Sequence, residues 1–524
     1  MIRNASRSTA AIATIFAVTV FGVSMSAAGD VQAQPAGPGA DPNLADDGLY
    51  VIVEATHRPL DAVLVIPPKC GIGREACGEI RAVIHNDMRL SGVVRALEVS
   101  PGKAAAMQKS AVPRFDVRKE AAKKAGVTWA IGTTIRKSKR NKKMLSIELQ
   151  VLNVKTAKML NLGRRATTEG PFSKLRVLAH RAANAIFGGL TGVEGSFDGQ
   201  FYYSSPGPKC ARCIWMADGD GYNARIVVGD KGIHMLPRPS ADLGVLYVSF
   251  RTELPSLFRL RGPEMDFLWN QSANVTTPPV QPKKRRKKRR KRRRGKKKAS
   301  KAPIQDTAGN IAPKLPASVL KPFATHDKLQ YRTATQATDG RIVATINDGE
   351  QADLWLLDHK GRPIRNLTNH EADDLDPSWA PDGQRIAFVS NRSGRPQIYI
   401  VRLDGTGLER ITFAGPYNTG PDWGPNGKIV YSGLRGGAVD ILTVDAAKQM
   451  QRLTPGKGKR SLEPSWTSCG RRVIYVSDED GGGPRMWVAS HDGAVRHPLA
   501  LGRGRYYTPV WRKRPGQRPR TFRP

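Results

Sequence analysis

A repeat of about 43 residues in the C-terminal part of the chain limits the folds that this sequence can adopt. A Pro-x-Trp motif recurs, and its successive prolines are 44, 43 and 45 residues apart: Pro377/Trp379, Pro421/Trp423, Pro464/Trp466 and Pro509/Trp511. In the best-preserved unit, residues 376–412, the turn residues Asp382 and Gly383 separate two strand-like runs. A period of 40–45 residues with four short strands per unit is typical of β-propeller blades. We expect each tryptophan to fill the wedge between neighbouring blades.

The spacing of the turns predicts six blades. Turn glycines mark five units, at Gly244, Gly340, Gly383, Gly427 and the region of Gly470. The last motif opens a unit with too few residues to complete a blade, and strands at 202–203, 214–216 and 225–228 can supply the rest. Such sharing would close the ring and remove its free sheet edges. The predicted fold class is α+β multi-domain, with a small N-terminal α/β domain followed by a six-bladed all-β propeller at 201–524.

A strongly basic segment interrupts the repeat. Gly244 and Gly340 are 96 residues apart, and the excess over one repeat matches residues 270–321. This segment includes 283–298, where fifteen of sixteen residues are Lys or Arg and contribute to a formal net charge of +39. So dense a block of like charge repels itself, so we predict a disordered insertion between two blades. It contains no aromatic residue for base stacking, and no nucleic-acid partner is expected.

The N-terminal residues are typical of an exported protein. Arg3 and Arg7 precede an apolar run, and small residues follow up to Ala33, which predicts a signal peptide over 1–33. An uncleaved membrane anchor is the alternative. Residues 34–47 are predicted to be a flexible lead and 48–195 a compact α/β domain. In an exported protein the polybasic segment 283–298 would meet anionic lipid or lipopolysaccharide.

Five cysteines fit an oxidising compartment. Cys70 and Cys77 enclose a short loop and could pair. Cys210 and Cys213 form a C-x-x-C, which could be a structural disulfide, a redox motif or part of a metal site. No second C-x-x-C or His pair lies nearby for zinc and no βαβ pattern follows for a redox motif, so a structural disulfide is favoured. Cys469 is predicted to be a lone thiol. No metal site and no cofactor are predicted.

The order of these parts resembles a known family. The S-W-x-P-D-G turns, the segment Asp218–Asn223 and the segment Leu190–Gly195 at the domain junction resemble the TolB family of the Tol–Pal system. The resemblance covers about residues 48–513. It implies a non-catalytic, monomeric adaptor in the periplasm that supports outer-membrane integrity and cell division. The basic insertion and the long lead depart from the family pattern.

The resemblance also implies two binding sites. A TolA-like inner-membrane protein would bind the segment that follows the lead, namely Leu49, Tyr50, Val51, Ile52, Val53 and Glu54. A Pal-like peptidoglycan-associated lipoprotein would bind rim loops that precede each Pro-x-Trp motif, through His326, Asp374, Leu375, Asn418, Thr419, Arg460, Ser461 and Leu462.

Other interpretations remain open at this point. The acidic residues Glu371, Asp373, Asp374 and Asp376 could collect a cation or a basic partner loop, or form a solvated rim. An exported propeller hydrolase or lyase that acts on an envelope polymer is one alternative function, although no G-x-S-x-G motif is present. A propeller that binds anionic surfaces and is unrelated to Tol–Pal is another.

Overall fold

The computed structural model describes residues 52–53, 60–110, 115–139, 141–252, 254–262, 321–325, 328–456 and 458–512. The predicted signal peptide, the flexible lead, most of the insertion at 270–321 and the cationic run 283–298 lie outside these residues. Within them, no helix combines the length and the apolar character needed to cross a bilayer.

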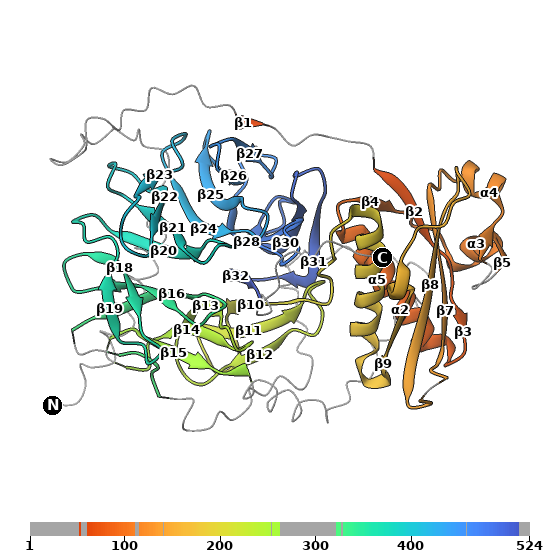
Figure 1. The fold of residues 1–524 in the computed structure, drawn as a ribbon, viewed down its shortest axis with the longest axis horizontal. Helices are drawn as coiled ribbons and strands as arrows, with labels where there is room; N and C mark the ends of the chain where they lie inside the picture. The colour runs from red at the N-terminus through yellow and green to blue at the C-terminus, as the bar shows by residue number, and fades with distance from the viewer. Residues whose placement is uncertain are drawn as a thin grey trace, which may run out of the picture. The chain divides into compact units, whose positions relative to one another are not determined.

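Residues 60–191 form an α/β domain around one sheet. The strand order is β4-β2-β7-β8-β9, with β3 beside β7 (Figure 1). Strand β2 pairs in parallel with β4 and with β7, and β3 also pairs in parallel with β7. The pairs β7–β8 and β8–β9 are antiparallel. The elements of this domain are β2 (Asp61–Val65), β3 (Lys69–Cys70), α2 (Arg74–Leu90), β4 (Val94–Ala96), α3 (Pro101–Ala106), β5 (Gln108–Ser110), β6 (Asp116–Val117), α4 (Lys119–Lys124), β7 (Trp129–Lys137), β8 (Met144–Asn153), η2 (Gly163–Ala166), β9 (Thr167–Pro171), η3 (Phe172–Lys174) and α5 (Leu175–Thr191).

Alternating side chains on the strands fill both faces of this sheet. Val63 and Val65 pack with Ile84 of α2 and Ile186 of α5 on one face. Leu64 and its neighbours of the same parity pack on the other face against α3, α4 and the β5–β6 pair. This is the period-2 pattern of a strand buried on both sides. Helices α2 and α5 thus cover one face of the sheet, and α3 and α4 cover the other.

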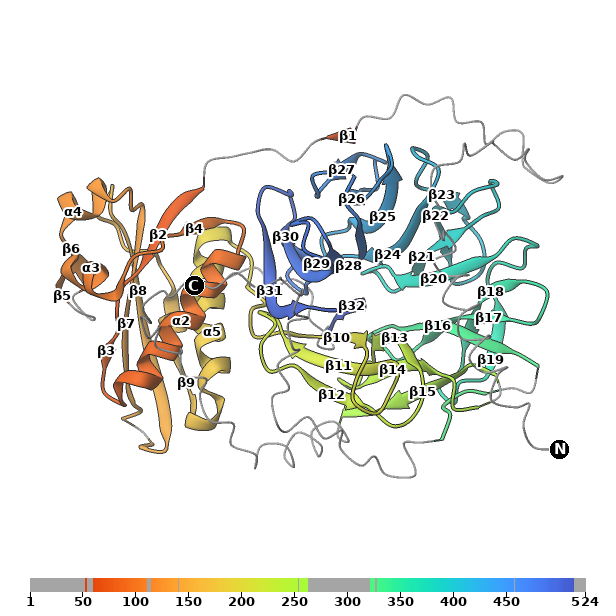
Figure 2. The ribbon, with the colours of Figure 1, turned by 180° about the vertical axis from the view of Figure 1, so that it is seen from behind.

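The rest of the described chain forms six small sheets, which confirms the six-bladed propeller (Figures 1 and 2). One sheet combines β32 (Tyr507–Trp511) with β10 (Gln200–Ser205), β11 (Cys213–Asp218) and β12 (Arg225–Val228). The other blades are β13 (His234–Pro239), β14 (Val245–Ser249) and β15 (Ser256–Leu260); β16 (Gln330–Gln336), β17 (Ile342–Asn347), β18 (Ala352–Leu357) and β19 (Pro363–Asn366); β20 (Asp374–Trp379), β21 (Arg385–Ser390), β22 (Gln397–Arg402) and β23 (Glu409–Arg410); β24 (Asn418–Trp423), β25 (Ile429–Arg435), β26 (Ala438–Val444) and β27 (Met450–Arg452); and β28 (Ser461–Trp466), β29 (Arg472–Ser477), β30 (Arg485–Ser490) and β31 (Arg496–Arg503).

The ring is closed by strands from the two ends of the propeller, as the sequence predicted. Phe201 of β10 pairs with Trp511 of β32, and Tyr202 pairs with Val510. The outer strands β11 and β12 then complete the same blade. Closure leaves no gap between the first and the last blade and no unpaired edge there.

The Pro-x-Trp motif joins each of the four blades that carry it to the preceding blade. Trp379 packs with Val343 and Leu354 of the preceding blade, and the indoles of Trp423, Trp466 and Trp511 also pack across a blade boundary. The middle residue of the motif accepts a hydrogen bond from the backbone N–H of the next tryptophan: Trp423 N to Ser378 Oγ (2.9 Å), Trp466 N to Asp422 Oδ2 (2.7 Å) and Trp511 N to Ser465 Oγ (3.1 Å). The repeat is therefore a structural device at the blade boundaries.

The basic insertion begins and ends in one blade. Before it, β15 forms the third strand of its sheet; after it, the backbone N–H of Phe323 and of Ala324 donates to the carbonyl oxygen of Leu257 in β15. Residues 323–324 thus occupy the position of the fourth strand. The sequence placed this segment between two blades, whereas the described flanks place it within one, because the turn spacing could not assign this short pairing.

Candidate protein-binding rim and central channel

The loops that enter the innermost strand of each blade form one rim of the propeller. The first residue of this strand is buried in three of the predicted positions, Asp374, Asn418 and Ser461. Leu375, Thr419 and Leu462, one residue later, are partly exposed, and Arg460 is exposed. His326 lies outside the described residues. The rim residues that can meet a partner are therefore Leu375, Thr419, Arg460 and Leu462.

The buried first residues make polar contacts inside the propeller: Asp374 and Ser461 within their own blade, and Asn418 with the preceding blade. Asp374 pairs with Arg392 at 2.8 Å, although burial raises the pKa of this carboxyl. Asn418 donates to Gln397 Oε1 (2.7 Å), and the Ser461 hydroxyl lies 2.9 Å from that of Ser477. These contacts stabilise the loops and do not face solvent. The sequence could not distinguish the two kinds of position, because the side-chain direction depends on a bulge in each inner strand.

The bulge follows a common pattern. The residue before the proline has a positive φ in five inner strands: Leu236 (54°), Asp376 (52°), Gly420 (60°), Glu463 (56°) and Thr508 (46°). The pairing register shifts at this point in β13, β20, β24 and β28. Bulges redirect a side chain and cost backbone strain at non-glycine residues. Here they direct acidic residues from separate blades toward the centre of the ring.

Charges from several blades interact in this central channel. Burial raises the pKa of Glu463 to about 7; the Thr508 amide, Arg212 and Arg238 oppose the shift, and the charge of Asp376 adds to it. Burial also raises the pKa of Asp376, again opposed by Arg238. Of the predicted acidic cluster, Asp376 takes part in these interactions, whereas Asp374 pairs with Arg392, Asp373 accepts the N–H of Ala352 and Glu371 is exposed. The four residues do not converge on one site.

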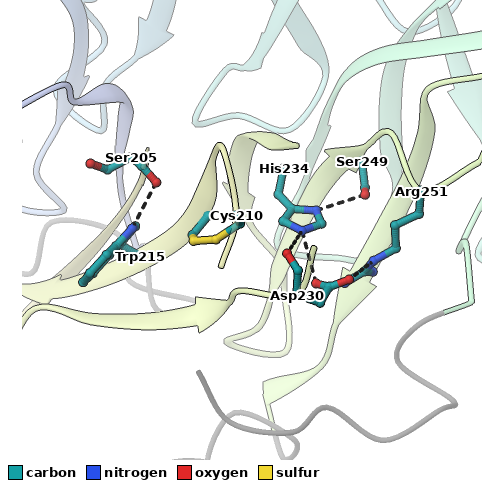
Figure 3. The surroundings of a disulfide bond; sticks show 8 residues. Ser205, Cys210, Trp215, Asp230, His234, Ser249 and Arg251 are labelled. Atoms are coloured by element: carbon teal, nitrogen blue, oxygen red, sulfur yellow. Dashed lines mark hydrogen bonds and ion pairs between the residues drawn. A yellow bond between two sulfur atoms is a disulfide. The ribbon is translucent and has the colours of Figure 1, made fainter. Parts of the chain in front are cut away.

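A Ser–His–Asp arrangement lies near the Cys210–Cys213 disulfide (Figure 3). His234 Nδ1 is 3.0 Å from Ser249 Oγ, and His234 Nε2 is 3.1 Å from Asp230 Oδ1. Burial would raise the pKa of Asp230, but hydrogen bonds from His234 and Arg251 lower it below its usual range. The side chains of His234 and Ser249 are fully buried, so no substrate reaches this serine.

The positions of His234 and Ser249 in their blade indicate a structural role for this arrangement. His234 begins its inner strand and faces Ser249 on the second strand, as Asp374 faces Ser390 and Ser461 faces Ser477. The same position thus forms a polar link in three blades. A nucleophile must be exposed to its substrate, and this one is not. The arrangement is a structural link and gives no support to a hydrolase.

A second buried cluster joins the α/β domain to the propeller. His180 of α5 lies 2.7 Å from Asp87 of α2 and 3.7 Å from Asp220, which lies between β11 and β12. Arg176 contacts Asp220 at 2.6 Å. One ligand atom from each of Asp87, His180 and Asp220 lies within 4.8 Å of the others, a grouping that could hold a metal ion. Arg176 and Arg472 already supply positive charge to these carboxylates, so a proton on His180 suits the cluster better than a metal ion.

No signal in the sequence pointed to this cluster, because Asp87, His180 and Asp220 are 40 or more positions apart and share no motif. The five cysteines form two disulfide bonds and leave one free thiol. Cys70 is bonded to Cys77 and Cys210 to Cys213, while Cys469 is free and buried.

Of the segment predicted to bind a TolA-like protein, only β1 (Ile52–Val53) is described; it pairs in parallel with Met450 and Gln451 of β27.

Comparison with known proteins agrees with this architecture. A family model of the TolB β-propeller domain matches residues 335–514. The Tol–Pal system protein TolB of Nitratidesulfovibrio vulgaris is 30% identical over 139 residues, 26% of this chain and 31% of the relative. The TolB of Bordetella pertussis is 28% identical over 156 residues, 29% of this chain and 35% of the relative. The crystal structure of TolB from Acinetobacter baumannii superposes with a TM-score of 0.65, covering 87% of this chain and 97% of that one at 19% identity.

The chain is a TolB-like protein. The sequence matches span about a third of the length of the curated relatives. The family-model match at 335–514 falls in the propeller. At 19% identity, the likeness to the Acinetobacter structure concerns the fold, including the α/β domain. The blade motifs of this TolB-like protein are thus the part shared in sequence, and the order of its two domains is shared in structure.

Proposed function

We propose that this TolB-like protein is a periplasmic, non-catalytic adaptor of a Tol–Pal-type envelope system. It would bind a Pal-like peptidoglycan-associated lipoprotein through the propeller rim and a TolA-like inner-membrane protein through residues 49–54, and so support outer-membrane integrity and cell division. The observation that carries this proposal is the match of the TolB propeller domain to residues 335–514, which contain the inner strands β20, β24, β28 and β32.

The rim supports binding of a protein loop. Leu375, Thr419 and Leu462 come from three consecutive blades, near the start of each inner strand, and are partly exposed. Arg460 adds a positive charge beside them, and Asp376 and Glu463 supply acceptors deeper in the channel. A row of partly exposed side chains that includes two leucines, with polar groups deeper in the ring, suits a partner loop with apolar and hydrogen-bonding side chains.

The N-terminal segment supports binding by strand exchange. Ile52 and Val53 pair with β27, which is otherwise the outermost strand of its blade. The exposed edge of a strand offers its backbone groups to another chain. Residues 52–53, which pair with the edge of β27, could in the same way pair with a strand of a partner. The same backbone groups cannot bind both, so a TolA-like strand would compete with β27 for residues 52–53.

Substitutions on the rim test the first interaction. We expect Leu375→Asp and Leu462→Asp each to weaken binding of the soluble domain of a peptidoglycan-associated lipoprotein by about tenfold or more, because each puts a charge in an apolar contact. Isothermal titration calorimetry measures the dissociation constant. The matched control is Leu408→Asp, since Leu408 is 45% exposed and lies in the β22–β23 turn at the other end of its blade. Equal affinities for all three variants would contradict the rim site.

A further inference from the structure

One end of the α/β domain carries seven exposed basic side chains without an ion pair to any described residue. They come from three segments: β3 with the start of α2, the turn between β7 and β8, and η3. We call this surface the basic end: Lys69, Arg74, Lys137, Lys139, Lys142, Lys143 and Lys174.

The fold brings the three segments together where β7 ends. Lys69 pairs with Thr134 of β7, and the N–H of Gly71 donates to the carbonyl of Ile135 at 2.7 Å. The Cys70–Cys77 disulfide ties β3 to the first turn of α2. On the other side, Met144 of β8 pairs with Pro171, directly before η3. The basic end is thus built on a paired sheet and a disulfide.

The turn that carries most of the lysines is also fixed. The N–H of Ser138 donates to the carbonyl of Met144 (2.8 Å), and the N–H of Met144 donates to that of Asn141 (2.9 Å). The Ser138 hydroxyl donates to Glu169 Oε1 at 3.2 Å. Figure 2 shows the hairpin running from the α4 end of the domain to the opposite end. The backbone on either side of these lysines is therefore held by hydrogen bonds.

Few acidic groups offset this charge. Glu148 is paired with Arg136, and Glu169 accepts the Ser138 hydroxyl. Glu75 is exposed beside Arg74. Against the seven basic side chains stand two carboxylates that are not paired with an arginine, those of Glu75 and Glu169. The surface therefore has a net positive charge.

We propose that the basic end docks the α/β domain on a surface of anionic phospholipid headgroups. Lysines supply point charges that need no fixed acceptor geometry, which suits a fluid layer of phosphates. Each basic residue near such a surface strengthens binding by about fivefold. The aromatic residue of this end, Phe172, packs on the domain core, so it offers no platform for nucleic-acid bases. The contact uses residues other than the rim residues and the polybasic run 283–298.

The test uses the full chain without residues 283–298 as the parent, so that the run cannot mask the effect. The tip variant is Lys139→Glu/Lys142→Glu/Lys143→Glu. The control is Lys124→Glu/Lys155→Glu/Lys158→Glu, which makes the same charge change with exposed lysines at the other end of the domain, where Trp129 pairs with Asn153. Co-sedimentation measures binding to phosphatidylcholine vesicles with and without phosphatidylglycerol.

We expect the parent and the control to bind the phosphatidylglycerol vesicles at low salt, and the tip variant to bind at least about tenfold more weakly. High salt should release all of them. Equal binding by the tip variant and the control, equal loss in both, or binding to duplex DNA without binding to the vesicles would overturn the proposal. Melting curves check the fold; if the tip variant unfolds, Lys139→Gln/Lys142→Gln/Lys143→Gln replaces it with the same expected direction.

Discussion

His180 stands between two carboxylates that belong to different domains. Asp87 Oδ2 lies 2.7 Å from His180 Nδ1, and Asp220 Oδ2 lies 3.7 Å from His180 Nε2. Burial alone would lower the pKa of His180, but the charge and hydrogen bond of Asp87 and the charge of Asp220 outweigh it and raise the pKa to about 9. At neutral pH the imidazolium is therefore the cation that joins α2 and α5 to the propeller.

We expect His180→Gln to destabilise the protein at pH 7 by about 3–5 kcal/mol, because it leaves two buried carboxylates short of positive charge. The folded-state pKa lies above the ordinary value of 6.5, so the stabilisation is complete below about pH 6.5 and is lost as the pH rises through about 9. Thermal unfolding between pH 6 and pH 10 should show the gap between wild type and variant closing toward pH 10.

His85 provides the matched control for this prediction. It lies on α2 as Asp87 does, but its contact is with Glu98, at 3.9 Å near the surface. His85→Gln should keep the pH dependence of the wild type. A gap between wild type and His180→Gln that stays constant from pH 6 to pH 10 would show that the proton on His180 does not hold the domains together.

Among the elements, β32 decides whether the propeller is a closed ring. Trp511 is fully buried, stacks on Phe201 with ring centroids 6.3 Å apart, and donates its backbone N–H to Ser465. Gly199 and Gly219 lie so close to the indole that an added Cβ would come within 2.3 and 2.6 Å of it. The single short strand β32 thus joins the C-terminal end of the propeller to its first strand, β10.

A chain that ends after Arg505 loses β32 and should unfold at a temperature at least about 10 °C lower, or fail to fold, because the ring opens and two sheet edges are exposed. Trp511→Ala alone should cost about 3–5 kcal/mol. Differential scanning calorimetry measures both. A chain that ends after Arg512 keeps β32 and should melt like the full protein; if the chain ending after Arg505 did so too, the ring would not depend on this strand.

At the scale of the whole molecule, a large share of the net positive charge lies in one run of the sequence. Residues 283–298 contribute 15 of the formal +39, and the chain returns to the same sheet on either side of them through Leu257 and Ala324. The folded blades therefore do not depend on this run for their pairing. Its positive charge favours anionic partners, and this effect weakens with salt.

Deletion of 283–298 should leave the melting temperature within about 1–2 °C of the full chain, since no described strand is removed. Binding to vesicles that contain phosphatidylglycerol should weaken at low salt and become equal for both proteins at high salt. Co-sedimentation at two salt concentrations measures this. A large fall in melting temperature would mean that the run packs on the propeller, and unchanged binding would exclude it as an anchor.

The sequence by itself determined the propeller, because a blade is a local unit. Turn glycines, the Pro-x-Trp motif and short apolar runs recur within about 43 residues, and the shortage of residues after Pro509 already implied the shared blade. The α/β domain followed from the periodicity of its helices and strands. Both results rest on interactions between residues that are near in sequence or repeat at a fixed interval.

Only the tertiary structure decided the functional surfaces. A bulge before each proline turns Asp376 and Glu463 into the channel and leaves Asp374 and Ser461 buried, although all four belong to the same short motif. The Asp87–His180–Asp220 cluster and the basic end unite residues from separate elements. Side-chain direction and long-range proximity depend on how strands pair and domains pack, and no local pattern encodes them.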